Sequence, residues 1–170
     1  MYNLENLAVA QGGAPKTNGR HWTNEEIQEA IFSGDDPVAQ DLLRFALEEG
    51  YKGRIQSDAR KVSAAFGFYL RVRKPDGSEG SQQCFNYVDG ARKLVVYVNW
   101  KPETMPPDVL ADYKSNLRSV LGAAFDMEAL EPNVPMVAIG DNLDAFKDVI
   151  RKVQRRIDPS RSAGFPRAEA

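Results

Sequence analysis

Polar and apolar residues alternate along the stretch AFGFYLRVR, residues 65–73. Such alternation is typical of a strand with one buried face. The apolar side would carry Phe66, Phe68, Leu70 and Val72, and the opposite side Tyr69, Arg71 and Arg73. The runs QQCFNYV and LVVYVNW predict further strands over 82–88 and 94–100, separated by the turn sequences KPDGSEGS and DGARK. The sequence therefore predicts a three-stranded antiparallel meander.

Helical patterns lie before and after the predicted meander. TNEE, which begins at Thr23, matches a capping box and predicts a helix start. Asp36 followed by Pro37 predicts a second N-terminal helix. Asp108 is expected to cap a central helix, and residues 141–158 predict a C-terminal helix with one apolar face. Helices should therefore cover the sheet.

Two short segments complete the predicted elements. Ser57 is expected to cap a short helix before the first strand, and the apolar run VPMVAIG, residues 134–140, predicts a short buried strand. The predicted fold is α+β: a three-stranded antiparallel meander plus one short strand, packed against N-terminal, central and C-terminal helices. It forms a single domain over residues 21–158, with a flexible arm at 1–20 and a disordered tail at 159–170.

Composition narrows the classes of function. The 170 residues include 22 basic and 24 acidic ones, so the net charge is −2 and any basic site must be local. Cys84 and His21 are the only cysteine and histidine, which excludes an intrachain disulfide and a paired-histidine metal site. We expect no metal and no cofactor. Without a signal-like start or an apolar run of about 18 residues, we expect a cytoplasmic protein that does not enter a membrane.

The polar face of the meander is the candidate binding site. We expect it to bring together six side chains from the three strands: Tyr69, Arg71, Arg73, Asn86, Tyr97 and Asn99. On an open face, the rings could stack on a base and the arginines could hold a phosphate or carboxylate. The structural alternative is that helices cover this face and only the polar tips reach its rim.

Three functions remain compatible with these patterns. We favour a non-enzymatic binding or regulatory module that contacts another protein through a sheet face or a helix surface. The first alternative is a nucleic-acid-binding protein or metal-dependent nuclease, because Asp76, Glu79, Asp89 and Lys93 lie around the two turns. The second is a small-molecule-binding domain with a pocket between sheet and helices.

Overall fold

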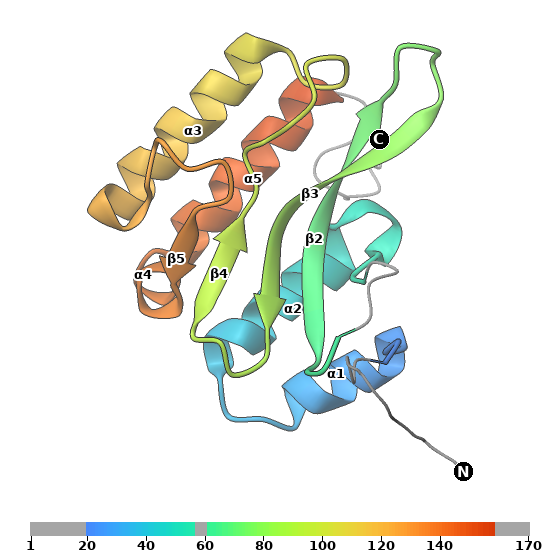
Figure 1. Ribbon diagram of the computed structural model, residues 1–170, viewed down its shortest axis with the longest axis vertical. Coiled ribbons are helices and arrows are strands. Elements are labelled where there is room, and N and C mark those ends of the chain that lie inside the picture. Colours follow the sequence, from blue (N-terminus) through green and yellow to red (C-terminus); the bar gives the residue numbers. More distant parts are fainter. Residues whose placement is uncertain (1–19, 57–60, 159–170) are drawn as a thin grey trace, which may run out of the picture.

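The computed structural model describes residues 20–56 and 61–158 of the chain. Its strands form one antiparallel sheet in the order β2–β3–β4–β5 (Figure 1). Their bounds are Ala65–Arg73 for β2, Glu79–Val88 for β3, Lys93–Val96 for β4 and Asn133–Pro135 for β5. The first three strands form a meander and the short β5 pairs with β4, which confirms the predicted α+β fold.

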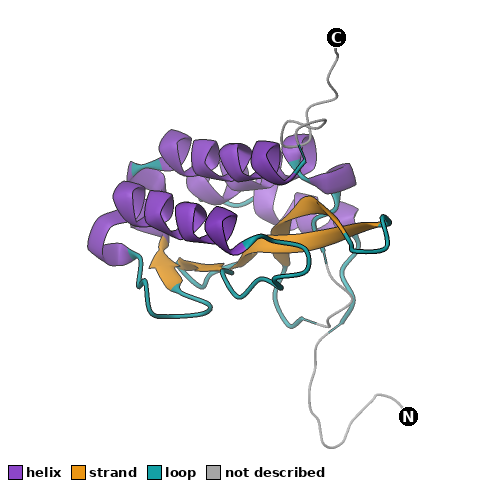
Figure 2. Ribbon diagram, turned by 90° about the horizontal axis from the view of Figure 1, so that it is seen from above, coloured by secondary structure: helices purple, strands orange, loops and turns teal. Residues whose placement is uncertain are grey.

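The long helices lie on one side of the sheet, and loops cover parts of the other side (Figure 2). The α-helices are α1 Asn24–Phe32, α2 Pro37–Glu49, α3 Pro107–Leu121, α4 Met136–Asp141 and α5 Leu143–Ile157, with 3-10 turns η2 at Tyr51–Gly53 and η3 at Gly122–Ala124. Within the described ranges, none of these helices has the length and apolar character needed to cross a membrane. The described residues thus form a two-layer structure in which one face of the sheet carries no helix, and this face is called the helix-free face.

Side-chain caps fix the starts of the first two helices. The Thr23 hydroxyl accepts from the amide of Glu26, whose carboxylate accepts from the Thr23 amide, so the predicted capping box is confirmed. Asp36 accepts from two amides of the first turn of α2, as predicted. Asp108 is not a cap, because α3 has Pro106 at that position. Asp108 lies in the first turn of α3, where a carboxylate still interacts favourably with the helix dipole.

Two predicted segments differ from the structure. The run over residues 134–140 forms a strand only up to Pro135, and α4 begins at Met136. A short apolar run fits a buried strand or a buried helical turn equally well, and proline is favoured where a helix begins. Residues 57–60, where a short helix was predicted, lie outside the described residues, and 61–64 are not helical.

The predicted arm and tail fall almost entirely outside the described part of the chain, which begins at Arg20 and ends at Asp158. The backbone of Arg20 pairs with that of Lys61 in an isolated antiparallel bridge. This bridge joins the start of α1 to the segment that leads into β2. It thereby ties the first described residue to the sheet.

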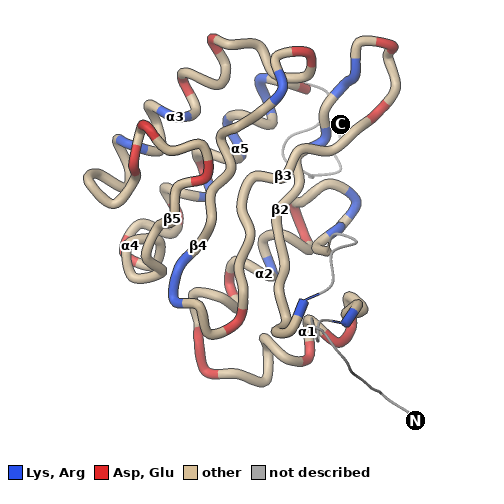
Figure 3. Tube along the Cα trace, viewed as in Figure 1, with Lys and Arg blue, Asp and Glu red and all other residues tan. Residues whose placement is uncertain are grey.

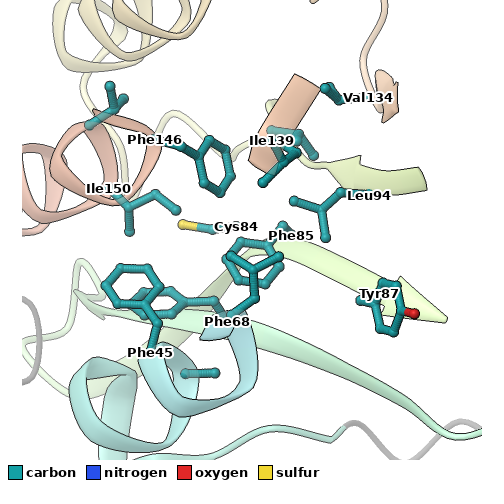
Figure 4. Packing of buried hydrophobic residues seen from close by; sticks show 14 of the residues in the cluster. Phe45, Phe68, Cys84, Phe85, Tyr87, Leu94, Val134, Ile139, Phe146 and Ile150 are labelled. Atoms are coloured by element: carbon teal, nitrogen blue, oxygen red, sulfur yellow. The ribbon is translucent and has the colours of Figure 1, made fainter. Parts of the chain in front are cut away.

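A row of aromatic rings connects the sheet to the helices (Figure 4). The ring centroids of Phe45 on α2 and Phe68 on β2 are 4.6 Å apart. Phe68 is 5.8 Å from Phe85 on β3, which is 5.9 Å from Phe146 on α5. All four rings are almost fully buried, so they form the centre of the core.

A β-bulge interrupts the pairing of β2 with β3. Phe68 lies opposite Phe85, but Tyr69 lies opposite Gln83, so Cys84 is an extra residue in β3. Cys84 and Phe85 are both fully buried, and the Cys84 side chain points towards Ile150 of α5 (Figure 4). Burial raises the pKa of the Cys84 thiol far above its ordinary value. This thiol is therefore a neutral part of the core.

The outer edge of β2 is closed by a side chain from α5. The Gln154 amide accepts from the Arg71 backbone N–H at 2.9 Å and donates to the Arg71 carbonyl at 3.0 Å. A neighbouring strand would make the same two hydrogen bonds. Nearer the start of β2, the Gly67 amide donates to the Ile55 carbonyl. The edge is thus protected from pairing with another chain.

Replacing Gln154 with alanine should lower the free energy of unfolding by about 1–3 kcal/mol, because both backbone groups of Arg71 lose a partner in the protein. Urea denaturation measures this change. Arg155→Ala, an exposed position on the same helix, is the control and should change stability by less than about 0.5 kcal/mol. Equal stability of the two variants would contradict the assigned role.

Candidate functional site

Two of the predicted binding residues are engaged within the protein. Tyr69 is only 5% exposed, and the Arg54 guanidinium lies over its ring at 4.6 Å from the centroid. The Arg71 side chain is 15% exposed and forms ion pairs with Asp158 and Glu79. The Arg71 charge is therefore already neutralised by two carboxylates.

The other four predicted residues are more accessible but do not form one cluster. Arg73 and Asn99 are exposed, and the Arg73 guanidinium donates to the Gly77 carbonyl in the hairpin turn. Asn86 is half-buried and lines a cavity of about 20 Å³, large enough for one water molecule. Tyr97 is also half-buried, and burial together with the Glu131 carboxylate raises the pKa of its hydroxyl.

The middle of the helix-free sheet face is filled by one side chain. Gln83 donates to the Phe85 carbonyl and to the Asn86 side-chain oxygen. Its amide nitrogen occupies the space next to Gly67, where a Cβ atom would come within 2.2 Å of it. Any side chain at position 67 would displace Gln83. This face is therefore internally bonded at its centre.

The acidic residues considered for a metal site lie at different ends of the sheet. Asp76 is in the turn before β3, whereas Asp89 is in the turn after it, and β3 is ten residues long. A strand of that length separates the two turns by about 30 Å. Among residues 20–56 and 61–158, no group of three histidine, cysteine or acidic side chains is placed to hold a metal ion.

A backbone site without a partner strand lies at the edge of β3 around Ser81. Arg71 directs its backbone groups to Gln154, away from β3. Its register partner Ser81 therefore directs its own N–H and C=O away from β2, as antiparallel geometry requires. No hydrogen bond to either group is made within the described part of the chain. This stretch of β3 has one free edge.

The edge is free because β4 turns away before it reaches Ser81. The last backbone bond from the β4 segment to β3 runs from the Tyr97 N–H to the Cys84 carbonyl, at the bulge. The Val98 amide faces the other side, where it donates to the Leu130 carbonyl, and Asn99, the next residue whose amide would face β3, makes no backbone bond to β3 within the described residues. The Trp100 ring stacks on Tyr113 of α3. The end of the β2–β3 hairpin consequently extends past β4 (Figure 1).

A cleft of about 340 Å³ lies beside this free edge. One wall is formed by residues 80–82 of β3 and the other by Lys101, Glu103 and Thr104, which follow β4. Val72 and Lys74 of the hairpin also line it. The volume falls in the range of known ligand-binding clefts. A free strand edge and a cleft therefore occur at one place in the fold.

The sequence pattern does not indicate this edge, because strand alternation shows which face a residue occupies and not which strand it pairs with. Comparison of the chain with protein-family models, curated proteins and solved structures gave no match. The site is therefore interpreted from its geometry alone.

Tyr51→Phe should raise the pKa of Glu79 towards its ordinary value of 4.5. The hydrogen bond from the Tyr51 hydroxyl is the main cause of the lowered pKa of this carboxyl, followed by the attraction of Arg71. Because the pKa is lowered on folding, ionised Glu79 favours the folded state above its ordinary pKa, and this contribution is lost as the pH falls through the folded-state pKa. Carbon-detected NMR titration measures the shift.

Tyr97→Phe is the matched control, because its hydroxyl lies near Glu131 and not near Glu79. An unchanged Glu79 pKa in Tyr51→Phe would show that the hairpin is not held to η2 through this contact.

Proposed function

We propose that this protein is a non-enzymatic binding module that captures an extended segment of another protein at the free edge of β3. The observation that carries the proposal is the N–H and C=O of Ser81, which have no hydrogen-bond partner among the described residues and lie beside a cleft of about 340 Å³. Strand addition of this kind uses main-chain hydrogen bonds for affinity and neighbouring pockets for specificity. The proposed contact is made by the edge of the sheet. The sequence had suggested the polar face of the meander, which lies next to this edge.

The size of the edge supports a short peptide as the ligand. Residues 79–83 of β3 extend beyond the last bond to β4, and five residues of strand span about 17 Å. Ser81 offers one donor and one acceptor in the middle of this stretch. The Gln83 carbonyl already accepts from the Gln82 side-chain amide at 3.0 Å, so it contributes less. A segment of about five residues would therefore fill the edge.

The nucleic-acid alternative has weaker support from the geometry. Arg71, one of its two strand arginines, is paired with two carboxylates, and the Tyr69 ring is covered by Arg54. A base could stack on Tyr69 only if Arg54 moved away. The free edge of β3 needs no such rearrangement to accept a strand.

Selection from a phage-displayed library of random dodecapeptides tests the proposed function. Peptides enriched on the wild-type protein should bind Ser81→Pro at least about tenfold more weakly, because proline removes the free N–H. The same substitution leaves the β2–β3 hydrogen bonds in place, since the Ser81 amide points away from β2. Fluorescence anisotropy with synthetic copies of the peptides measures the affinities.

Ser81→Ala is the matched control. It also removes the bond from Arg54 to the Ser81 hydroxyl, but it keeps the backbone N–H. Enriched peptides should bind it as tightly as the wild-type protein, and circular dichroism should show that both variants are folded. Equal binding to all three proteins, or no enrichment, would overturn the proposed function.

A further inference from the structure

We infer that the segment captured at the β3 edge is acidic, with a glutamate or aspartate side chain between Lys74 and Lys101. This inference rests on the proposed function and specifies the chemistry of the partner. Both lysines line the cleft, one from the hairpin and one from the chain after β4. Figure 3 shows basic segments on both of these stretches.

Neither lysine forms a direct ion pair within residues 20–56 and 61–158. The pKa of Asp76 in the hairpin turn is lowered chiefly by hydrogen bonds from Ser78 and, to a smaller extent, by the charge of Lys74. Arg71, Lys147, Arg151 and Arg156, by contrast, each contact a carboxylate. The lining of the cleft holds these two lysines and one carboxylate, Glu103, so its charge is net positive. An incoming carboxylate would meet two ammonium groups that form no direct ion pair with the described residues, which favours an acidic ligand over a basic one.

The Lys74 side chain is held close to the free edge. Its aliphatic part passes over Gly80, where an added Cβ would lie 2.9 Å from the Lys74 Cε atom. The Lys74 backbone is fixed by two hairpin bonds of 2.9 Å, one from its amide to the Ser78 carbonyl and one from the Gly77 amide to its own carbonyl. The residue next to Gly80 is Ser81. The charge is therefore presented beside the groups that would bind the strand.

The opposite wall is also anchored. The Lys101 carbonyl accepts from the amides of Thr104 at 3.1 Å and Met105 at 3.0 Å, which closes a turn. Met105 is 1% exposed and packs in the core, so this turn is attached to the body of the protein. Lys101 itself is exposed at the mouth of the cleft. The two lysines thus stand on two fixed walls.

The geometry of a strand defines the pattern expected in the partner. Alternate residues of an added strand point to the same side, about 6.6 Å apart. Only one of the two sides faces the cleft. We therefore expect acidic residues at alternate positions of the captured segment, with no charge requirement on the positions between them.

The same peptide library distinguishes this inference from the proposed function. Peptides enriched on the wild-type protein should carry acidic residues at alternate positions, and replacing these with glutamine should weaken binding about five- to tenfold. Added salt should weaken binding further. Selection on the double variant Lys74→Glu, Lys101→Glu should enrich peptides with lysine or arginine in place of the acidic residues.

Lys93→Glu, Lys152→Glu is the matched control, because it changes the net charge equally at two exposed positions outside this cleft. It should enrich the same acidic peptides as the wild-type protein. Neutral or basic peptides that still depend on the Ser81 amide would overturn the inference and leave the proposed function standing. The absence of any enriched peptide would overturn both.

A second copy of this chain could also occupy the β3 edge, and measurement of self-association tests this. If sedimentation velocity shows a dimer of the wild-type chain that Ser81→Pro converts to a monomer, the edge is occupied by a second copy. That result would overturn the inference of an acidic partner segment. A wild-type monomer that binds the acidic peptides supports it.

Discussion

The extra residue in β3 is the constraint on which the arrangement of the sheet depends. From Phe85 to Tyr87, β3 is paired on both sides, with β2 and with β4; before Cys84, residues 79–83 are paired with β2 alone within the described part of the chain. A bulge increases the local twist of a strand and bends it, so the antiparallel strands β3 and β4 diverge beside it. At the bulge, Cys84 and Phe85 are both buried in the core beneath α5.

The two halves of the β2–β3 hairpin consequently have different surroundings. The half near the β3–β4 turn is covered by the aromatic row from Phe45 to Phe146. The other half carries the hairpin turn, the cleft and the unpaired groups of Ser81. Trp100 contributes to the opening as well, because its stacking on Tyr113 directs the chain after β4 towards α3. Packing in the core and accessibility at the edge thus have a common structural origin.

The sequence predicted the elements better than their partners. Local signals such as the capping box at Thr23 and the Asp36 cap involve contacts over two or three residues, and both were correct. The alternation that continues through Trp100 suggested a long third strand, yet β4 ends at Val96. Tyr97 makes one more bond to β3, at Cys84, and Val98 bonds to Leu130. The alternation of apolar and polar residues shows that one face of a segment is buried. It can continue after the segment has stopped pairing with its neighbouring strand.

The candidate site was harder to predict for the same reason. The adjacent buried residues Cys84 and Phe85 do not reveal the bulge by themselves, because six consecutive residues of β2, residues 65–70, are buried as well. The pairing of Arg71 with Asp158 joins positions 87 residues apart, and no local pattern indicates it. The aromatic and basic side chains near position 70 suggested a binding face. The site proposed from the structure consists of backbone groups of Ser81, which are free in the described part of the chain because β4 ends before it reaches them.

The bond between Gln154 and Arg71 also limits how copies of the chain could assemble. Two molecules could pair through the free edges of their β3 strands. The opposite edge of each hairpin, the outer edge of β2, is occupied by Gln154 of α5, so this hairpin would offer no further edge to a third molecule. Such a contact would be self-complementary and would close after two molecules. Growth of a continuous ribbon through this hairpin is therefore opposed by the Gln154 side chain, together with the backbone bond between Gly67 and Ile55.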